Sequence, residues 1–171
     1  MADLEDLIET VKSRTAEVKV VGIEGVQIDD VGELLSRLME LGEFQLLDGA
    51  MVLGRGHVDF AIFEAARSME SGENVSQSLA MEILVKASCT TQISEAIELM
   101  GVREDSESLV MVGVKVTEEQ LQEALALTGG RRSERPFEVE KDNRERVKGR
   151  LALSEPVEVS LLERIALSGV R

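Results

Sequence analysis

The side chains best suited to chemistry in this chain are two singletons, His57 and Cys89. A cysteine becomes a nucleophile when a base or a helix N-terminus lowers its pKa, and Cys89 stands just before a predicted helix start at Thr90 or Thr91. One reading is therefore a small enzyme that uses Cys89 with His57. A lone cysteine is more often a small buried apolar side chain, and we favour that second reading.

Other catalytic patterns are missing from the sequence. It contains no His-Glu-x-x-His, no Cys-x-x-Cys, no phosphate-binding P-loop and no calcium loop. The turn at Gly54-Arg55-Gly56 lacks the spacing and the acidic partner of a dinucleotide fingerprint. A single cysteine allows neither a disulfide nor a cysteine zinc site within one chain. We therefore expect no enzymatic activity, no cofactor and no metal site, and a binding or regulatory role.

Composition limits the partners that the chain can have. A net charge of -14 over 171 residues repels phosphate backbones, which argues against DNA and against indiscriminate nucleic-acid binding. Residues 131–150 are an exception, because eight basic residues face five acidic ones there. Alternating signs favour a solvated surface over a phosphate-facing patch. No apolar run reaches the ~20 residues of a membrane span and the first residues are acidic, so we expect a cytoplasmic protein without membrane contact.

The spacing of apolar residues predicts the elements that would position these side chains. An Asp48-Gly49 turn suggests a hairpin, and Thr117 with Gln120 forms a capping box that starts a helix. Helices are expected near residues 4–11, 30–41, 58–69, 76–87, 90–100, 117–128 and 156–166, and strands near 18–23, 44–47, 51–53 and 109–116.

Helices outnumber strands in this pattern, and the two do not alternate regularly. The fold class is therefore α+β, a single helix-rich domain with a small mixed, mostly antiparallel sheet packed by helices, and not a doubly wound sheet. We expect one domain over residues 1–171, with residues 1–15 as an N-terminal helical extension.

Several motifs between residues 57 and 102 occur in an unusual order. They are His-Val-Asp-Phe-Ala from His57, Met-Glu-Ile-Leu from Met81, Ala-Ser-Cys-Thr-Thr-Gln-Ile-Ser-Glu-Ala-Ile from Ala87 and Gly-Val from Gly101. A strand near 108–116 and a C-terminal Leu-Glu-Arg-Ile-Ala-Leu-Ser from Leu162 follow. Over roughly residues 17–171, the chain resembles the TPRKB-type regulatory subunits of the KEOPS complex.

The resemblance implies a non-catalytic subunit of the assembly that installs threonylcarbamoyl on a tRNA adenosine. Such a subunit binds and stimulates the small atypical kinase of the complex, and archaeal members help to recruit tRNA through its single-stranded 3′ CCA end. Many archaeal members carry arginine where this chain has Thr91, so the RNA contact here would rely on hydrogen bonds or on another base.

A CCA end requires stacking surfaces, hydrogen bonds and a modest positive field. With no Trp or Tyr in the chain, stacking would fall to His57, a phenylalanine, an arginine plane or aliphatic faces. The helix start near Gln92 would offer free backbone N–H groups to phosphate or ribose oxygens. Two or more of Arg55, His57, Arg67 and Lys86 are expected to line the same cleft. The candidate RNA-binding residues are Arg55, His57, Lys86, Ser88, Thr90, Thr91 and Gln92.

The C-terminal helix is the candidate kinase contact, because interfaces expose apolar anchors with a polar rim. Its apolar residues would otherwise pack on the core of the domain. An alternative function is a stand-alone cytoplasmic adaptor that binds protein without RNA contact, with residues 131–150 facing the partner. The candidate partner-binding residues are Leu161, Leu162, Ile165 and Leu167.

Overall fold

The computed structural model describes residues 4–168, which form eight α-helices, two short 3-10 helices and four strands. The helices are α1 (Leu4–Ala16), α2 (Val31–Leu41), α3 (Gly54–Ser71), α4 (Leu79–Ala87), α5 (Ile93–Met100), α6 (Glu118–Leu127), α7 (Lys141–Arg150) and α8 (Val157–Leu167). The strands are β1 (Val18–Glu24), β2 (Glu43–Asp48), β3 (Ser108–Val114) and β4 (Arg131–Arg132), and the 3-10 helices are η1 (Gly49–Met51) and η2 (Arg135–Phe137).

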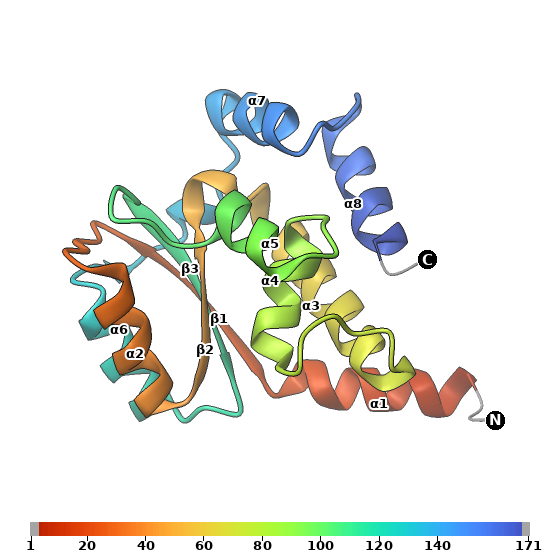
Figure 1. Ribbon diagram of the computed structural model, residues 1–171, viewed down its shortest axis with the longest axis horizontal. Coiled ribbons are helices and arrows are strands. Elements are labelled where there is room, and N and C mark those ends of the chain that lie inside the picture. Colours follow the sequence, from red (N-terminus) through yellow and green to blue (C-terminus); the bar gives the residue numbers. More distant parts are fainter. Residues whose placement is uncertain (1–3, 169–171) are drawn as a thin grey trace.

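The strands form one sheet in the order β2-β3-β1-β4, with helices on both faces (Figure 1). Every strand pair is antiparallel, so the α+β class is confirmed and the sheet contains no parallel pair within residues 4–168. The central strand β3 is apolar on both sides, because successive side chains of a strand point to opposite faces. Leu109 and Met111 pack under α2 and α6, whereas Val110 and Val112 pack under α3 and α4.

The predicted helix starts agree well with the structure where a capping motif is present. Asp30 accepts a hydrogen bond from the Glu33 backbone N–H at 2.9 Å and begins α2. Thr117 and Gln120 form the complete capping box of α6. Both motifs are local in sequence, which is why the sequence alone predicts them.

The predicted hairpin at the Asp48-Gly49 turn is wrong. The Asp48 carboxylate instead accepts a hydrogen bond from the Ala50 N–H at 3.0 Å and caps η1, and the chain then enters α3 at Gly54. A Cβ atom at Gly49 would lie 2.2 Å from Ser108 Oγ, so this turn packs directly against the start of β3. Residues 51–53 form no strand, and α3 begins four residues earlier than its apolar stripe indicates.

The N-terminal helix α1 is present as predicted, although two residues of its apolar stripe are exposed. Val11 is buried against the α3 side of the core, whereas Leu4 and Ile8 are exposed. An Arg14–Glu70 ion pair also joins α1 to α3. Of the predicted extension, residues 1–3 lie outside the described range. Within that range, the helices are too short or too polar to cross a bilayer.

Candidate functional site

The loop between α4 and α5 holds the centre of the candidate site. Ser88 and Thr90 are buried, whereas Thr91 and Gln92 are exposed. The Thr90 hydroxyl accepts a hydrogen bond from the Gln92 N–H at 3.2 Å and donates one to the Glu95 carboxylate at 2.6 Å. Thr90 therefore fixes the start of α5 from inside, and the side chains of Thr91 and Gln92 are left to meet a partner.

The first turn of α5 presents backbone donors beside an apolar surface. The N–H groups of Ile93, Ser94 and Glu95 have no acceptor within the helix, because an α-helix leaves its first N–H groups unpaired. Ile93 and Ile97 are exposed on the same helix. The arrangement offers hydrogen-bond donors and an aliphatic face at one place, which suits an anionic oxygen next to a flat ring.

His57 lies beneath this loop and not on its surface. Its Nδ1 accepts a hydrogen bond from the Leu53 N–H at 3.0 Å, and its Nε2 therefore carries the proton and donates to the Ala87 carbonyl at 2.9 Å. Burial lowers the pKa of His57 to about 4, so the ring is neutral at pH 7. The expectation that His57 stacks on a base is corrected, because only 2% of the residue is exposed.

The basic residues expected to share one cleft do not line one together, although Lys86 and Arg67 lie close enough for their charges to interact. Lys86 is 1% exposed and its Nζ lies 3.5 Å from Ser168 Oγ, at the end of α8. Arg55 pairs with Asp59 at 3.1 Å and lies over the Phe137 ring at 5.2 Å. Arg67 pairs with Glu64 on α3 and with Glu73 in the loop after α3. The expectation of a common cleft is therefore wrong: Ser88, Thr90, Thr91 and Gln92 come together, and Arg55 and Lys86 point elsewhere.

Cys89 has none of the environment that activates a thiol. Its backbone has a left-handed φ of 57°, which turns the chain between α4 and α5. Burial raises the pKa of the Cys89 thiol to about 11, and the nearby Arg164 lowers it by less. Both ring nitrogens of His57 are already engaged with the backbone. A Cys–His enzyme would need a free imidazole base and a thiolate, and His57 and Cys89 provide neither.

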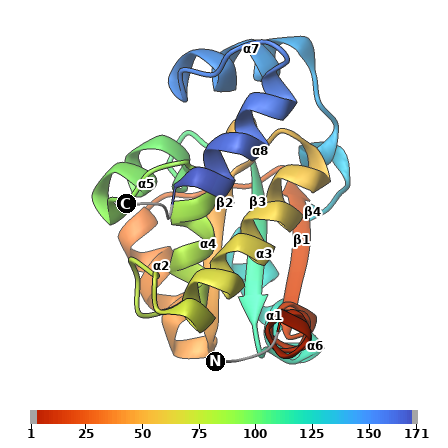
Figure 2. The same ribbon diagram turned by 90° about the vertical axis from the view of Figure 1, so that its right-hand side faces the viewer.

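A second candidate region is an apolar groove between the start of α3 and α8, with a volume of about 490 Å³. Figure 2 looks onto α8 where it lies across α3. Phe60, Phe63, Leu161 and Leu162 supply its apolar walls, and Asp59 and Glu158 stand at its rim. Sequence reasoning missed the two phenylalanines, although they lie three residues apart on one helical face.

The four apolar candidates on α8 divide into two pairs. Leu161 and Ile165 are buried in the core, as the packing alternative predicted. Leu162 and Leu167 are exposed, at 39% and 63%. A partner can therefore reach Leu162 and Leu167 directly, whereas Leu161 and Ile165 hold the helix in place.

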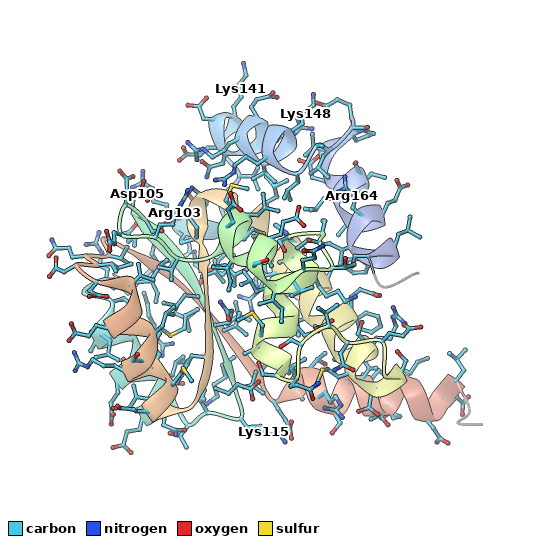
Figure 3. All side chains as sticks on the ribbon, in the orientation of Figure 1. Arg103, Asp105, Lys115, Lys141, Lys148 and Arg164 are labelled. Carbon is cyan, nitrogen blue, oxygen red and sulfur yellow. The ribbon has the colours of Figure 1, made fainter. Side chains whose placement is uncertain are left out.

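A polar cleft of about 690 Å³ separates α7 from the nearest end of the sheet, where Figure 3 labels Arg103 and Lys141. Four arginines line it, but six acidic residues line it as well, so it lacks the positive field of a phosphate site. This balance favours the solvated reading of residues 131–150. Within residues 4–168, no three His, Cys, Asp or Glu side chains gather in a way that could hold a metal ion.

The amino-acid sequence of the chain matches a family of kinase-binding proteins. The family model described as kinase binding protein CGI-121 matches residues 26–169, and the chain belongs to this family. It is also 30% identical over 122 residues to the regulatory protein Cgi121 of Methanocaldococcus jannaschii, a match that covers 71% of this chain and 74% of that protein. The family resemblance seen in the sequence is thus confirmed, and the family description supports a kinase-binding regulatory role.

Proposed function

We propose that this chain is a non-catalytic subunit of a KEOPS-type assembly that makes threonylcarbamoyl-adenosine in tRNA. In this role it binds and stimulates the small atypical kinase of the assembly, and it recruits tRNA through the single-stranded 3′ CCA end. The observation that carries the proposal is membership of a kinase-binding family in a chain whose single histidine is buried and neutral and whose single cysteine is partly buried with a raised pKa. We also propose that it acts in the cytoplasm.

The kinase is proposed to dock on the groove between α3 and α8. Phe63 and Leu162 are exposed apolar anchors at this groove, and Leu167 extends the apolar surface along α8. The carboxylates of Asp59 and Glu158 at the rim favour a partner segment with an apolar face and basic flanks. The groove thus supplies both the anchors and the polar rim of a transient interface.

A binding measurement with purified kinase from the same organism tests this proposal. Phe63→Ala and Leu162→Asp should each weaken the Kd by roughly 30-fold or more, as expected for a buried interface anchor. Met39→Asp is the matched control, because Met39 is 79% exposed on α2, which covers the other face of the sheet. Unchanged affinity in both groove variants would remove the groove as the docking site.

The RNA contact is proposed for the loop at residues 88–92 and the first turn of α5. The Gln92 side chain offers two donors and an acceptor to a base edge or a ribose, and the backbone N–H groups of Ile93 and Ser94 suit a phosphate oxygen. The exposed faces of Ile93 and Ile97 replace the aromatic platform that the chain lacks. His57 supports this loop from inside, whereas Lys86 reaches the end of α8, and neither is proposed as a direct contact.

Gel-shift titrations with intact tRNA and with tRNA trimmed of its 3′ CCA test the RNA contact. Gln92→Ala should weaken binding of intact tRNA about fivefold, which corresponds to one lost hydrogen bond. Gln122→Ala on α6 is the control, since Gln122 is equally exposed on the opposite side of the sheet. Equal binding of trimmed and intact tRNA would contradict end recognition.

The salt dependence of the same titration separates end recognition from general electrostatic binding. Few phosphates are neutralised in the proposed contact, so the affinity should fall only shallowly as the salt concentration rises. A steep fall would point to a broad basic surface. A kinase complex that forms without any tRNA binding would favour the stand-alone adaptor, the second candidate function.

A further inference from the structure

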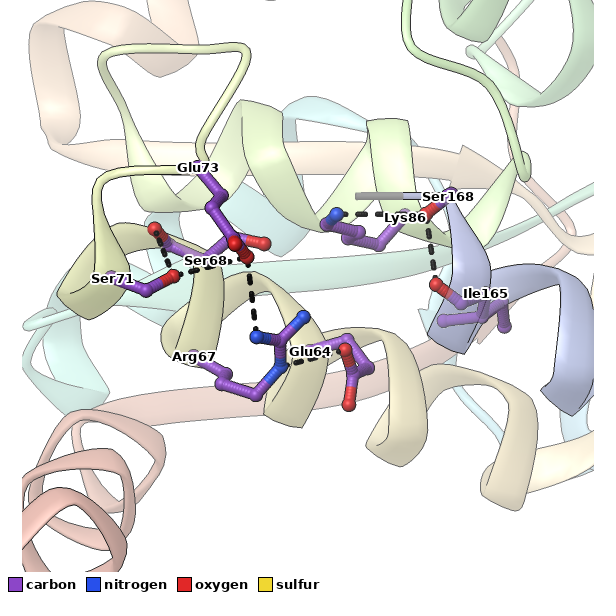
Figure 4. A network of polar contacts seen from close by, with 8 residues as sticks. All are labelled: Glu64, Arg67, Ser68, Ser71, Glu73, Lys86, Ile165 and Ser168. Atoms are coloured by element: carbon purple, nitrogen blue, oxygen red, sulfur yellow. Dashed lines mark hydrogen bonds and ion pairs between the residues drawn. The ribbon is translucent and has the colours of Figure 1, made fainter. Parts of the chain in front are cut away.

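Two neighbouring groups of polar contacts lie on α3, α4 and the end of α8 (Figure 4): Arg67 pairs with Glu64 and Glu73, and Lys86 contacts Ser168. Glu64 on α3 accepts a hydrogen bond from Arg67 at 3.0 Å, and Arg67 also pairs with Glu73 at 3.3 Å. Glu82 on α4 accepts hydrogen bonds from the backbone N–H groups of Val75 and Ser76 at 3.0 and 2.8 Å. These contacts hold the loop between α3 and α4 in place.

Lys86 follows Glu82 by one helical turn of α4, and its side chain contacts the end of α8. Four residues separate the two side chains, so they lie on the same face of α4. Glu82 Oε1 is buried without a hydrogen-bond partner among the described residues, and the Lys86 ammonium supplies a compensating charge nearby. Burial lowers the pKa of Lys86, and the nearby negative charges of Glu82 and Glu64 offset this effect only in part.

The other side of Lys86 faces the C-terminus of α8. Ser168 is the residue that ends α8, and its hydroxyl donates to the Ile165 carbonyl at 2.8 Å. Lys86 Nζ lies 3.5 Å from that hydroxyl oxygen. A helix C-terminus carries a partial negative charge and unpaired carbonyls, which a lysine ammonium stabilises.

We infer that Lys86 is a positioning residue for the partner-binding surface of α8. It holds the last turn of α8 against α4 and so fixes Leu167, which precedes Ser168 and is 63% exposed. The inference rests on the proposed docking of the kinase at α8. It assigns to Lys86 an indirect role in protein binding, exerted from a position that no partner can touch.

The variant Lys86→Met separates positioning from folding. Removing one partner of a buried charge pair is destabilising, whereas removing both charges is often neutral, so Lys86→Met is made in a Glu82→Gln background and compared with Glu82→Gln alone. It removes the ammonium from the end of α8 but keeps the packing of the aliphatic stem. Lys115→Met is the matched control, because the Lys115 side chain is 69% exposed and lies far from α8 (Figure 3).

Two readouts on Lys86→Met test the inference. Hydrogen exchange of the backbone amides at residues 165–168 should become roughly tenfold faster, the size expected from loss of a favourable charge at a helix end, while amides of α3 stay protected. The Kd for the kinase should rise by several-fold, and Lys115→Met should change neither value.

Each other result of this experiment contradicts the inference. Unchanged exchange at residues 165–168 would show that Lys86 does not hold the last turn of α8. Faster exchange with an unchanged Kd would show that this turn does not position the partner surface. The groove variants Phe63→Ala and Leu162→Asp test the docking site independently. A failure of the Lys86 inference can therefore be told apart from a failure of the proposed kinase contact.

Discussion

The helices on the two faces of the sheet bury different kinds of side chain. On one face, α2 and α6 bury only apolar residues among those described. On the other face, α3 and α4 bury His57, Glu64, Glu82 and Lys86 along with their apolar residues. Burying an ionisable group costs free energy unless it is paired, and each of these four groups has a hydrogen-bond or ion-pair partner.

The difference follows the division between the scaffold and the segments that we propose to contact partners. The His57 ring ends on the Ala87 carbonyl, directly before the loop at residues 88–92. Lys86 ends on Ser168, at the end of α8. The two buried bases therefore each fix a segment that we propose to contact a partner. On the apolar face, α2 and α6 bury no ionisable side chain within the described residues, and their polar contacts, such as Gln120 Nε2 to the Leu41 carbonyl at 2.8 Å, lie at the helix ends.

The largest expected effect is on the scaffold face. Leu38→Ala should lower the free energy of unfolding by about 3 kcal/mol, because it leaves a cavity where a side chain is only 2% exposed. Urea unfolding followed by circular dichroism measures this value, and Met39→Ala, at an exposed neighbour, should change it little. Partner affinity measured on the folded variant should be unchanged. A loss of affinity would contradict the view that the face covered by α2 and α6 takes no part in partner binding.

His57→Gln should remove a pH dependence from the stability of the other face. The pKa of His57 is about 4 in the folded protein and ~6.5 when unfolded, so protonation favours unfolding. His57 stabilises fully above pH 6.5, and this contribution falls by about 2 kcal/mol between pH 6.5 and pH 5. Urea unfolding at pH 7.5 and pH 5 should therefore show a smaller change in the variant than in the wild type. Equal changes would mean that His57 is not buried neutral.

Sequence reasoning succeeded where the signal is local and failed where it depends on tertiary contacts. The capping box at Thr117 and the apolar stripe of α3 lie within one element, and both were predicted. The two-residue strand β4 pairs with β1 across more than a hundred residues of sequence, and no local pattern indicates it. The burial of His57 and Lys86 follows from the packing of α3, α4 and α8, which the sequence does not specify residue by residue.

Thr90→Val should have a smaller effect than His57→Gln, confined to the start of α5. The Thr90 hydroxyl accepts from the Gln92 N–H just before α5 and donates to Glu95 in its first turn, and loss of such a hydrogen bond costs about 1 kcal/mol. Thr91→Val is a matched control with the same change of atoms, because Thr91 is exposed. Thermal unfolding of the two variants should separate them by several degrees. Identical melting temperatures would show that the hydrogen bonds of the Thr90 hydroxyl contribute nothing to stability.

Arg144→Gln should have the smallest effect, because its charges remain in contact with water. Arg144 on α7 pairs with Glu155 at 3.1 Å and with Glu158 at 2.9 Å, and both glutamates are about half exposed. Exposed pairs contribute little and are screened by salt, since the Debye length shrinks to about 3 Å at 1 M. The variant should melt slightly below the wild type in dilute buffer and together with it at 1 M NaCl. If the melting temperatures still differ at 1 M NaCl, the ion pairs of Arg144 contribute as strongly as the buried charges of α3 and α4. Solvent exposure would then not explain a difference between the exposed and the buried charges.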